Sequence, residues 1–356
     1  MYTEKYTHYK NTYGGKIMRG DKSWNERMRE LLAERGWDAK DWRRATKVDQ
    51  RILENLLSAD TDGMPEEQLD PIYELTEQAE TAKGMLRFDH PVIIAVWAHK
   101  GGTGKSTTTA NLSYELSTRG YNVLVIDTDS QSDVSSVLYP RYVNEQERSF
   151  YDAFSICEDF VEDGYVRNTD YDGLDIVTGS EKCEALEGVL CVMEDRMRNK
   201  MWPKCLRKIR DENYYDFVLI DMDKTMGIMN KSILAVSDYV LSPIEPNIFS
   251  VKSILAVITQ VEQFQAENSK LKILGIFYNK VDLRKKKSLQ EAMELVEGVS
   301  AENVLKTYIK SDANVENSQK EHLPLGYYNK SSAASKQTAE LADEILGKIA
   351  KEMEEG

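Results

Sequence analysis

The sequence predicts an α/β protein whose largely parallel, twisted sheet is flanked by helices and follows a small all-α N-terminal region. After residue 90, short runs rich in Val and Ile alternate with helical stretches, and such alternation implies parallel strands joined by right-handed crossovers. Before residue 83, hydrophobic residues recur at helical spacing between capping residues. The length of 356 residues suits about two domains.

These patterns divide the chain into four segments. Residues 1–23 are polar and are predicted to form a flexible arm. A helical domain is expected over 24–82, a linker over 83–90, and the α/β domain over 91–356.

Composition excludes several classes of protein. Hydrophobic residues make up 41% of the chain and charged residues 30%, as in ordinary soluble domains. No apolar run can span a bilayer and the polar N-terminus does not resemble a secretory signal, so we expect no membrane contact. None of the four cysteines stands in a C-x-x-C pair, which favours a reducing, cytoplasmic location over a disulfide framework or zinc ribbon.

Net charge bears on nucleic-acid binding. The sum is −14, so contacts with phosphate have to come from local basic patches. Two clusters stand out, at 196–210 and at 284–287.

The N-terminal helices are expected in a closely spaced series. The first covers 24–35 and stops at Gly36, the second is capped by Asp38, the third is capped by Asp49, and a fourth covers 64–82. Helices at this spacing over about 24–57 resemble a helix-turn-helix module. In that interpretation the third helix would offer Gln50, Arg51 and Asn55 to base edges. A helical docking or dimerisation domain is the alternative, because the acidic segment 52–90 would repel phosphate.

The strands of the α/β domain follow from the apolar runs. They are expected at 92–98, 122–127, 174–178, 216–221, 238–243, 272–279 and 304–308. Functional loops are expected at their carboxyl ends.

The segment VIIAVWAHKGGTGKSTTT, at 92–109, is typical of a phosphate-binding loop between a strand and a helix that begins near Lys105. Glycines let successive N–H groups turn inward and form a nest for a β-phosphate. Lys105 would reach the β- and γ-phosphate oxygens, Ser106 would ligate Mg²⁺, and Thr107 would contact the α-phosphate. The loop itself thus predicts a nucleotide-binding set of Gly101, Gly102, Thr103, Gly104, Lys105, Ser106 and Thr107.

The loop departs from the general G-x-x-x-x-G-K-[ST] pattern because His99 and Lys100 open it. It instead resembles the K-G-G-x-G-K-[ST] motif of the deviant Walker A family of P-loop NTPases, which includes the partition ATPase ParA, the positioning ATPase MinD and the nitrogenase iron protein. The matching residues are Lys100, Gly101, Gly102, Gly104, Lys105 and Ser106. The resemblance implies a dimer that sandwiches two ATP molecules, with Lys100 crossing to the partner's nucleotide and Lys105 as a second catalytic lysine.

A pair of carboxylates follows the second strand of the α/β domain. Asp127 and Asp129 can hold a Mg²⁺-bound water and orient the attacking water. By the family's pattern, Asp129 is the water-orienting, catalytic residue, and Asp127 belongs to the metal site behind the waters of Mg²⁺ or pairs with a lysine. Ser130 and Ser132 replace the family's proline and glycine.

A third carboxylate, Asp221, ends the strand at 216–221 and matches the Walker B residue that grips Mg²⁺ through water. Asp223 and Lys224 stand where the family has two prolines, whereas Gly227 is retained. Further along, Asn279 sits where the family places its adenine-reading residue, and an amide suits adenine.

Within the family, the sequence favours a ParA-like ATPase with weak intrinsic hydrolysis, acting in plasmid or chromosome partition. The cysteines do not suit a cluster shared between subunits, and the acidic C-terminal helix over 338–356 does not suit anionic lipid. The resemblance implies a nucleoid-associated dimer that binds nonspecific DNA when loaded with ATP and is stimulated by a ParB-like centromere-binding partner.

Candidates for the DNA contacts are Arg284, Lys285, Lys286 and Lys287, and the basic residues of 196–210, although such runs are often solvated helix faces. Two alternatives remain: a DNA-binding autorepressor with nucleotide as effector, and a positioning ATPase for non-DNA cargo.

Overall fold

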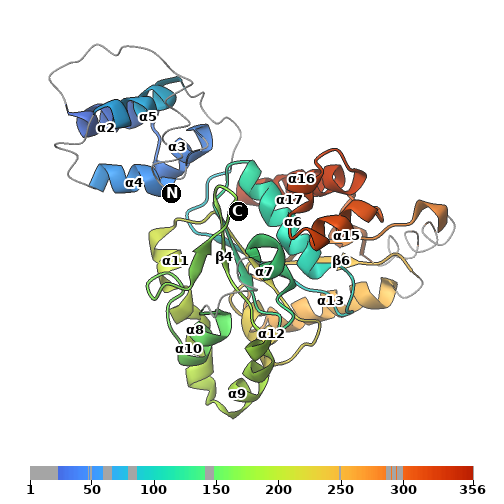
Figure 1. The fold of residues 1–356 in the computed structure, drawn as a ribbon. Helices are drawn as coiled ribbons and strands as arrows, with labels where there is room; N and C mark the ends of the chain where they lie inside the picture. Colours follow the sequence, from blue (N-terminus) through green and yellow to red (C-terminus); the bar gives the residue numbers. More distant parts are fainter. Residues whose placement is uncertain are drawn as a thin grey trace. The chain divides into compact units, whose positions relative to one another are not determined.

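The computed structural model forms two compact units, Met1–Met85 and Leu86–Gly356 (Figure 1). The structure describes residues 23–46, 48, 50–58, 66–78, 86–140, 148–247, 250–285, 290, 294 and 300–355. The predicted arm lies outside these residues except for Ser23.

The described part of the N-terminal unit is helical, as predicted. Its helices are α2 (Trp24–Arg35), α3 (Ala39–Thr46), α4 (Gln50–Ser58) and α5 (Glu66–Gln78). Ser23 and Glu26 form a capping box at the start of α2, and Gly36 ends that helix with a φ of 64°. Asp38 caps α3, because its carboxylate accepts the N–H of Asp41 at 2.8 Å.

Two tryptophans organise the core of this unit. The Trp24 indole donates to the carbonyl of Leu69 at 2.9 Å, and the Trp42 indole donates to the hydroxyl of Thr76 at 2.7 Å. Both rings are buried with Met28 and with residues of α4 and α5. The acidic helix α5 is therefore an integral part of the bundle.

The second unit is built on a seven-stranded sheet in the order β3-β4-β2-β5-β1-β6-β7. The strands are β1 (Val92–Val96), β2 (Val123–Asp127), β3 (Val166–Asn168), β4 (Leu174–Val177), β5 (Phe217–Asp221), β6 (Tyr239–Ile244) and β7 (Lys272–Tyr278). All neighbouring pairs are parallel except β3 with β4. The predicted α/β fold with a largely parallel sheet is thus confirmed.

Helices cover both faces of the sheet (Figure 1). They are α6 (Lys105–Thr118), α7 (Asp133–Leu138), α8 (Phe150–Ile156), α9 (Leu186–Val192), α10 (Asp195–Cys205), α11 (Arg207–Glu212), α12 (Ile228–Leu234), α13 (Ser250–Phe264), α15 (Ala313–Lys320), α16 (Leu325–Tyr328) and α17 (Ala333–Glu355). Short 3₁₀ turns are η2 (Glu181–Ala185), η3 (Leu283–Lys285) and η4 (Ala301–Asn303).

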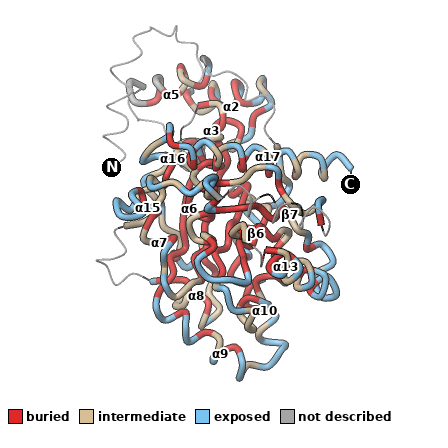
Figure 2. Tube along the Cα trace, turned by 90° about the vertical axis from the view of Figure 1, so that its right-hand side faces the viewer, coloured by how far each residue is buried: buried red, intermediate tan, exposed pale blue. Residues whose placement is uncertain are grey.

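Alternate strand residues point to opposite faces, as the pleat requires. Ile93, Ala95 and Trp97 join one core with residues of α8, α10, α12 and α13. Ile94 and Val96 are buried but do not belong to that core. Figure 2 shows the resulting buried centre with exposed outer helix surfaces.

Residues 304–308 do not form the predicted strand. Only one isolated bridge joins Val304 to Ile276 of β7. The carboxylate of Glu344 on α17 accepts the N–H groups of Lys306 and Thr307 at 2.8 and 2.9 Å, so these groups are withdrawn from strand pairing. The sequence also did not predict β3, a three-residue antiparallel strand at the opposite edge.

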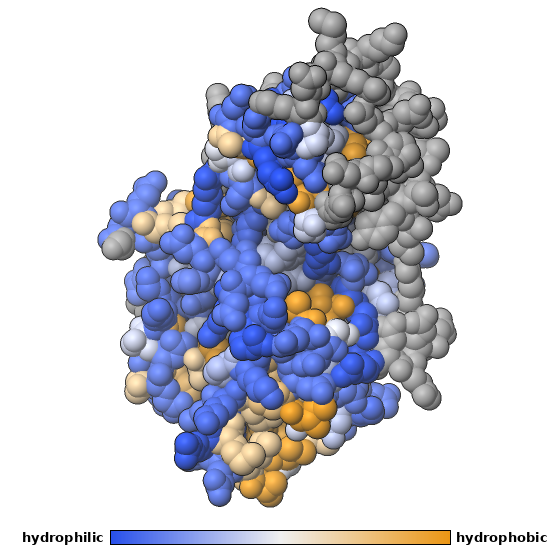
Figure 3. Space-filling model, turned by 90° about the vertical axis from the view of Figure 1, so that its left-hand side faces the viewer, coloured by the Kyte–Doolittle hydropathy of each residue, from blue (hydrophilic) through white to orange (hydrophobic). Residues whose placement is uncertain are grey.

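The C-terminal helix packs inward, as expected from its acidic composition. Leu341, Ile345 and Ile349 of α17 are buried. Among the described residues, no helix combines the length and apolar character needed to cross a membrane. Figure 3 shows one face of the protein, which is mostly hydrophilic and carries hydrophobic residues in separate patches.

Candidate nucleotide site

The phosphate loop adopts the conformation that its glycines predict. Gly102 and Gly104 have φ angles of 77° and 92°, which residues with a side chain rarely adopt. A Cβ on Gly104 would overlap the amide of Asn279. Helix α6 begins directly after Gly104, so its free N–H groups face the space above the loop.

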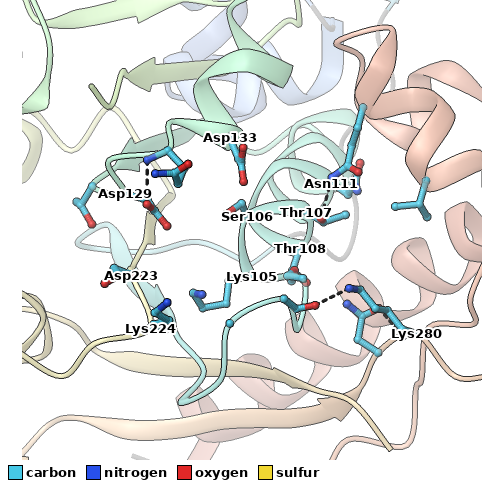
Figure 4. A pocket seen from close by; sticks show the side chains of 18 of the residues that line it. Lys105, Ser106, Thr107, Thr108, Asn111, Asp129, Asp133, Asp223, Lys224 and Lys280 are labelled. Atoms are coloured by element: carbon cyan, nitrogen blue, oxygen red, sulfur yellow. Dashed lines mark hydrogen bonds between the residues drawn. The ribbon is translucent and has the colours of Figure 1, made fainter. Parts of the chain in front are cut away.

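That space is a cavity of about 890 Å³, large enough for a nucleotide (Figure 4). Predicted residues that line it are Gly101, Gly102, Gly104, Lys105, Ser106, Thr107, Asp129 and Asn279. Lys105 is only 8% exposed, and no ion pair holds its ammonium among the residues described. A buried cation of this kind fits a phosphate ligand.

Two predicted residues of the loop lie elsewhere. Lys100 is exposed and lines a small separate pocket with Glu245 and Asn247. Thr103 lines that same pocket, and its carbonyl accepts the Asn279 amide N–H at 2.8 Å. Thr103 thus holds the loop against β7, and Lys100 is directed out of its own nucleotide cavity.

The predicted metal carboxylates lie side by side behind the cavity. Asp127 and Asp221 are paired in the register of β2 with β5, and both are fully buried. Ser106 donates its hydroxyl to Asp221 at 2.7 Å, and Thr109 donates to the other oxygen of this carboxylate at 3.1 Å. Burial, and then the charge of Asp127, raises the pKa of Asp221 well above its usual value.

Asp127 organises the loop that follows β2. Its carboxylate accepts the N–H and hydroxyl of Ser135 at 2.9 and 2.6 Å and the N–H of Asp129 at 3.2 Å. Burial raises the pKa of Asp127 to about 7, although these hydrogen bonds lower it. A cation placed between the two buried carboxylates and the phosphates would favour their charged forms.

These donors fit Mg²⁺. The ion prefers oxygen ligands and keeps several waters, and here a serine hydroxyl reaches the cavity with a carboxylate behind it. In the described ranges, no three His, Cys, Asp or Glu side chains gather into a cage that could hold a metal. The hydroxyl of Ser106, phosphate oxygens and waters would therefore be the ligands of the ion. The ion would neutralise part of the phosphate charge.

Of the three predicted carboxylates, Asp129 is the one that lines the cavity. One of its oxygens accepts the N–H of Gln131 at 3.0 Å, which fixes the side chain at the turn before α7. Asp133, the first residue of α7, lines the same end of the cavity (Figure 4). The other oxygen of Asp129 is left to bind a water.

The other end of the cavity lies between β7 and α15. Asn279 lines it, with its amide N–H already bonded to Thr103. Lys280 donates to the carbonyl of Gly102, and Gln319 of α15 donates to the hydroxyl of Thr107 at 3.0 Å. No pattern in the sequence pointed to Gln319, because 212 residues separate it from Thr107.

The loop after β5, residues 222–227, is fixed from two sides and is called the switch loop below. Asn230 donates its amide to the carbonyls of Asp223 and Thr225, both at 2.7 Å. Glu187 of α9 accepts the N–H groups of Ile228 and Met229 at 2.7 and 3.1 Å, and so caps α12. A Cβ on Gly227 would lie 2.5 Å from Glu187 oxygens, so a side chain here would displace the carboxylate that caps α12.

The residues predicted to contact DNA are only partly described. Arg51 and Asn55 lie one turn apart on α4, whereas the side chain of Gln50 is outside the described residues. Arg284 is exposed and makes two bonds to Asp282 at 2.9 and 3.0 Å, so a carboxylate offsets its charge. The side chain of Lys285, and Lys286 and Lys287 entirely, also lie outside the described residues.

Comparison with known proteins agrees with this geometry. The pattern of the family described as "AAA domain" matches residues 92–273, just over half of the chain. The chromosome-partitioning ATPase Soj of Treponema pallidum is 27% identical over 70% of this chain and 94% of its own length. The cell division ATPase MinD of Pyrococcus furiosus is 28% identical, covers 71% of this chain and 98% of its own, and superposes with a TM-score of 0.56.

The septum site-determining protein MinD of Pyrococcus horikoshii, a structure in complex with Mg-ADP, shares the fold at 22% identity, with a TM-score of 0.54 over 72% of this chain and 96% of its own. The family match begins at β1, after the N-terminal unit. The chain therefore belongs to the AAA domain family and is a P-loop ATPase of the ParA/MinD type.

Proposed function

We propose that this protein is a partition ATPase that forms an ATP-dependent sandwich dimer, binds nonspecific DNA in that state, and releases it when a ParB-like centromere-binding partner stimulates hydrolysis. The cargo would be a plasmid or a chromosome, and the protein would be cytoplasmic and associated with the nucleoid. Support comes from relatives named for chromosome partition, including Soj of Treponema pallidum and ParA of Caulobacter vibrioides.

The observation that carries the dimer is the contrast between two lysines of one loop. Lys105 lies inside the cavity and is nearly buried, whereas Lys100 is exposed and lines a different pocket. A lysine that serves only its own nucleotide would line its own cavity. The position of Lys100 favours a role toward the nucleotide of a second copy.

Helix α10 offers the better-supported surface for DNA. Within 196–210, carboxylates pair with several cations: Arg198 with Asp195, Arg207 with Glu162, and Lys208 with Glu212. The remaining cations of α10 are exposed, and the described residues bring no carboxylate to ion-pair distance of them: Arg196, Lys200 and Lys204. Their spacing of four places them on one face of the helix.

The N-terminal unit would add a second contact with DNA through α4, where Arg51 and Asn55 share a face. Several other arginines of the unit are used within it. Arg27 pairs with Asp70 at 3.5 Å, Arg44 pairs with Asp41 at 3.6 Å, and Arg35 donates to the carbonyl of Glu77. Less of the positive charge of this unit is thus available to phosphate than the sequence indicates.

The proposal is tested by the solution mass with ADP and with a nonhydrolysable ATP analogue, each with and without random-sequence duplex DNA. We expect the 40.7 kDa chain to be a monomer with ADP and a dimer with the analogue, and to bind duplex DNA only as the dimer. The Lys100→Ala variant should bind the analogue and remain a monomer. A wild-type chain that stays single when saturated with the analogue would contradict the dimer.

The DNA surface is tested by the salt dependence of binding. Replacing Arg196, Lys200 and Lys204 together with glutamine should reduce the slope of log K against log salt by up to about 2.7, since each phosphate that a cation neutralises adds about 0.9 to the slope. The matched control replaces the carboxylate-paired Arg198, Arg207 and Lys208 and removes the same charge. Equal slopes for the two triple variants would exclude α10, and glutamine at 284–287 tests the other cluster in the same assay.

The two alternatives give distinct outcomes in these experiments. An autorepressor would protect one defined operator in a footprint, and nucleotide, as its effector, would change the affinity for that operator. A positioning ATPase for non-DNA cargo would dimerise with the analogue yet bind no random duplex.

A further inference from the structure

The switch loop brings a third lysine to the nucleotide. Lys224 lines the same cavity as Lys105, and Figure 4 shows the two side chains close to each other beside the phosphate loop. The Cδ atom of Lys224 lies 3.4 Å from the point where a Cβ on Gly101 would stand. The stem of Lys224 therefore lies against the opening of the phosphate loop.

This is the end of the cavity that suits a terminal phosphate. Asn279, Ile309 and Val315 line the other end, where amide and apolar groups suit a base. The nest at Gly102–Lys105 lies between the two ends and suits the middle phosphate. A nucleotide that runs through the cavity would thus place its last phosphate between Asp129 and Lys224.

The backbone under Lys224 is held in place at three successive carbonyls. Asn230, which is 3% exposed, binds those of Asp223 and Thr225. The buried indole of Trp97 donates to the carbonyl of Lys224 itself at 3.4 Å. A side chain on so fixed a segment is preorganised and loses little backbone freedom when it meets a ligand.

Neither of the two lysines is held in an ion pair with any described residue. In the part of the chain that the structure describes, no carboxylate pairs with Lys224 or Lys105, although both reach one cavity. Asp223, the nearest acidic residue in sequence, accepts the N–H of Thr225 at 3.3 Å. Both ammonium groups are thus able to donate charge-assisted hydrogen bonds to the oxygens of a polyphosphate.

We propose that Lys224 binds the γ-phosphate of ATP within its own chain and gives the site its preference for ATP over ADP. The inference rests on the ATP site described above and goes beyond the proposed function, because the cation comes from the same chain and the contact needs no dimer. The hydrogen bonds of Asn230 and Trp97 supply the rigidity that a proline would otherwise give this loop. The position is therefore free to carry a lysine that contacts phosphate.

The test is calorimetric titration of Lys224→Ala with ADP and with a nonhydrolysable ATP analogue. Removing one charge-assisted hydrogen bond should lower the affinity for the analogue about tenfold or more. ADP affinity should stay at the wild-type value, which also shows that the fold and cavity are intact. Lys224→Arg should keep most of the preference for the triphosphate. Lys231→Ala, which removes an exposed lysine of α12 outside the cavity, is the matched control.

The same titrations in a Lys100→Ala background separate this inference from the proposed dimer. The preference for the triphosphate should persist in Lys100→Ala and disappear in the double variant. The inference is overturned if Lys224→Ala changes neither affinity, or if it lowers the affinity for ADP as much as that for the analogue. It is also overturned if the effect of Lys224→Ala vanishes once Lys100 is replaced. Failure of dimerisation or DNA binding would leave these titrations unaffected.

Discussion

ATP binding is expected to disappear when Lys105 is replaced with alanine. The ammonium is the one cation that is both buried and inside the cavity among the described residues, and phosphate oxygens at the loop would lose their charged donor. The affinity for ATP should fall about a hundredfold or more, because no ammonium then reaches the β- and γ-phosphates at this position. Titration with a fluorescent ATP analogue at micromolar concentration measures this effect.

The control for this variant is Lys336→Ala, which removes an exposed lysine of α17. It should bind ATP as the wild type does. Circular dichroism of both variants establishes that the fold is retained. If folded Lys105→Ala kept wild-type affinity, the cavity over the phosphate loop would not be the nucleotide site.

Slower hydrolysis without a matching decrease in binding is the expected defect of Asp129→Ala. Asp129 lines the cavity and one of its oxygens accepts the N–H of Gln131, and we expect the other oxygen to orient the attacking water. Removing a group that positions or deprotonates the attacking water typically costs about 10²- to 10⁴-fold in rate. Phosphate release in a single turnover measures the rate, and titration measures the affinity.

For this experiment the matched variant is Glu340→Gln, which neutralises an exposed carboxylate on α17. It should hydrolyse ATP at the wild-type rate. A rate for Asp129→Ala close to that of wild type would remove Asp129 from the reaction and leave Asp133 as the carboxylate to examine at that end of the cavity.

The phosphate loop could be predicted from the sequence because its chemistry is local. Gly102, Gly104 and Lys105 are close in the chain, and the strand before them and the helix after them fix their geometry. Asp127 and Asp221 were also predictable, because each ends an apolar strand. Their side-by-side position followed only once β2 and β5 were seen to be neighbours.

The parts of the site that long-range packing decides could not be predicted in advance. Glu187 caps a helix whose first residues follow it by 41 and 42 positions, and no capping pattern in the sequence joins the two. Gln319 reaches Thr107 across the cavity for the same reason. The departure at Lys224 was visible, but its place in the cavity depends on Trp97 and Asn230, which no motif includes.

The far edge of the sheet has a bearing on solubility at high local concentration. Beyond β7, the backbone N–H groups of Leu305 and Ile309 donate to carbonyls of Ile276 and Tyr278. The N–H groups of Lys306, Thr307 and Lys310 instead donate to side chains of α17. An open β7 would invite strand addition from another molecule and so promote fibrous aggregation. The irregular cover removes that template and so protects the protein from edge-to-edge stacking at high concentration.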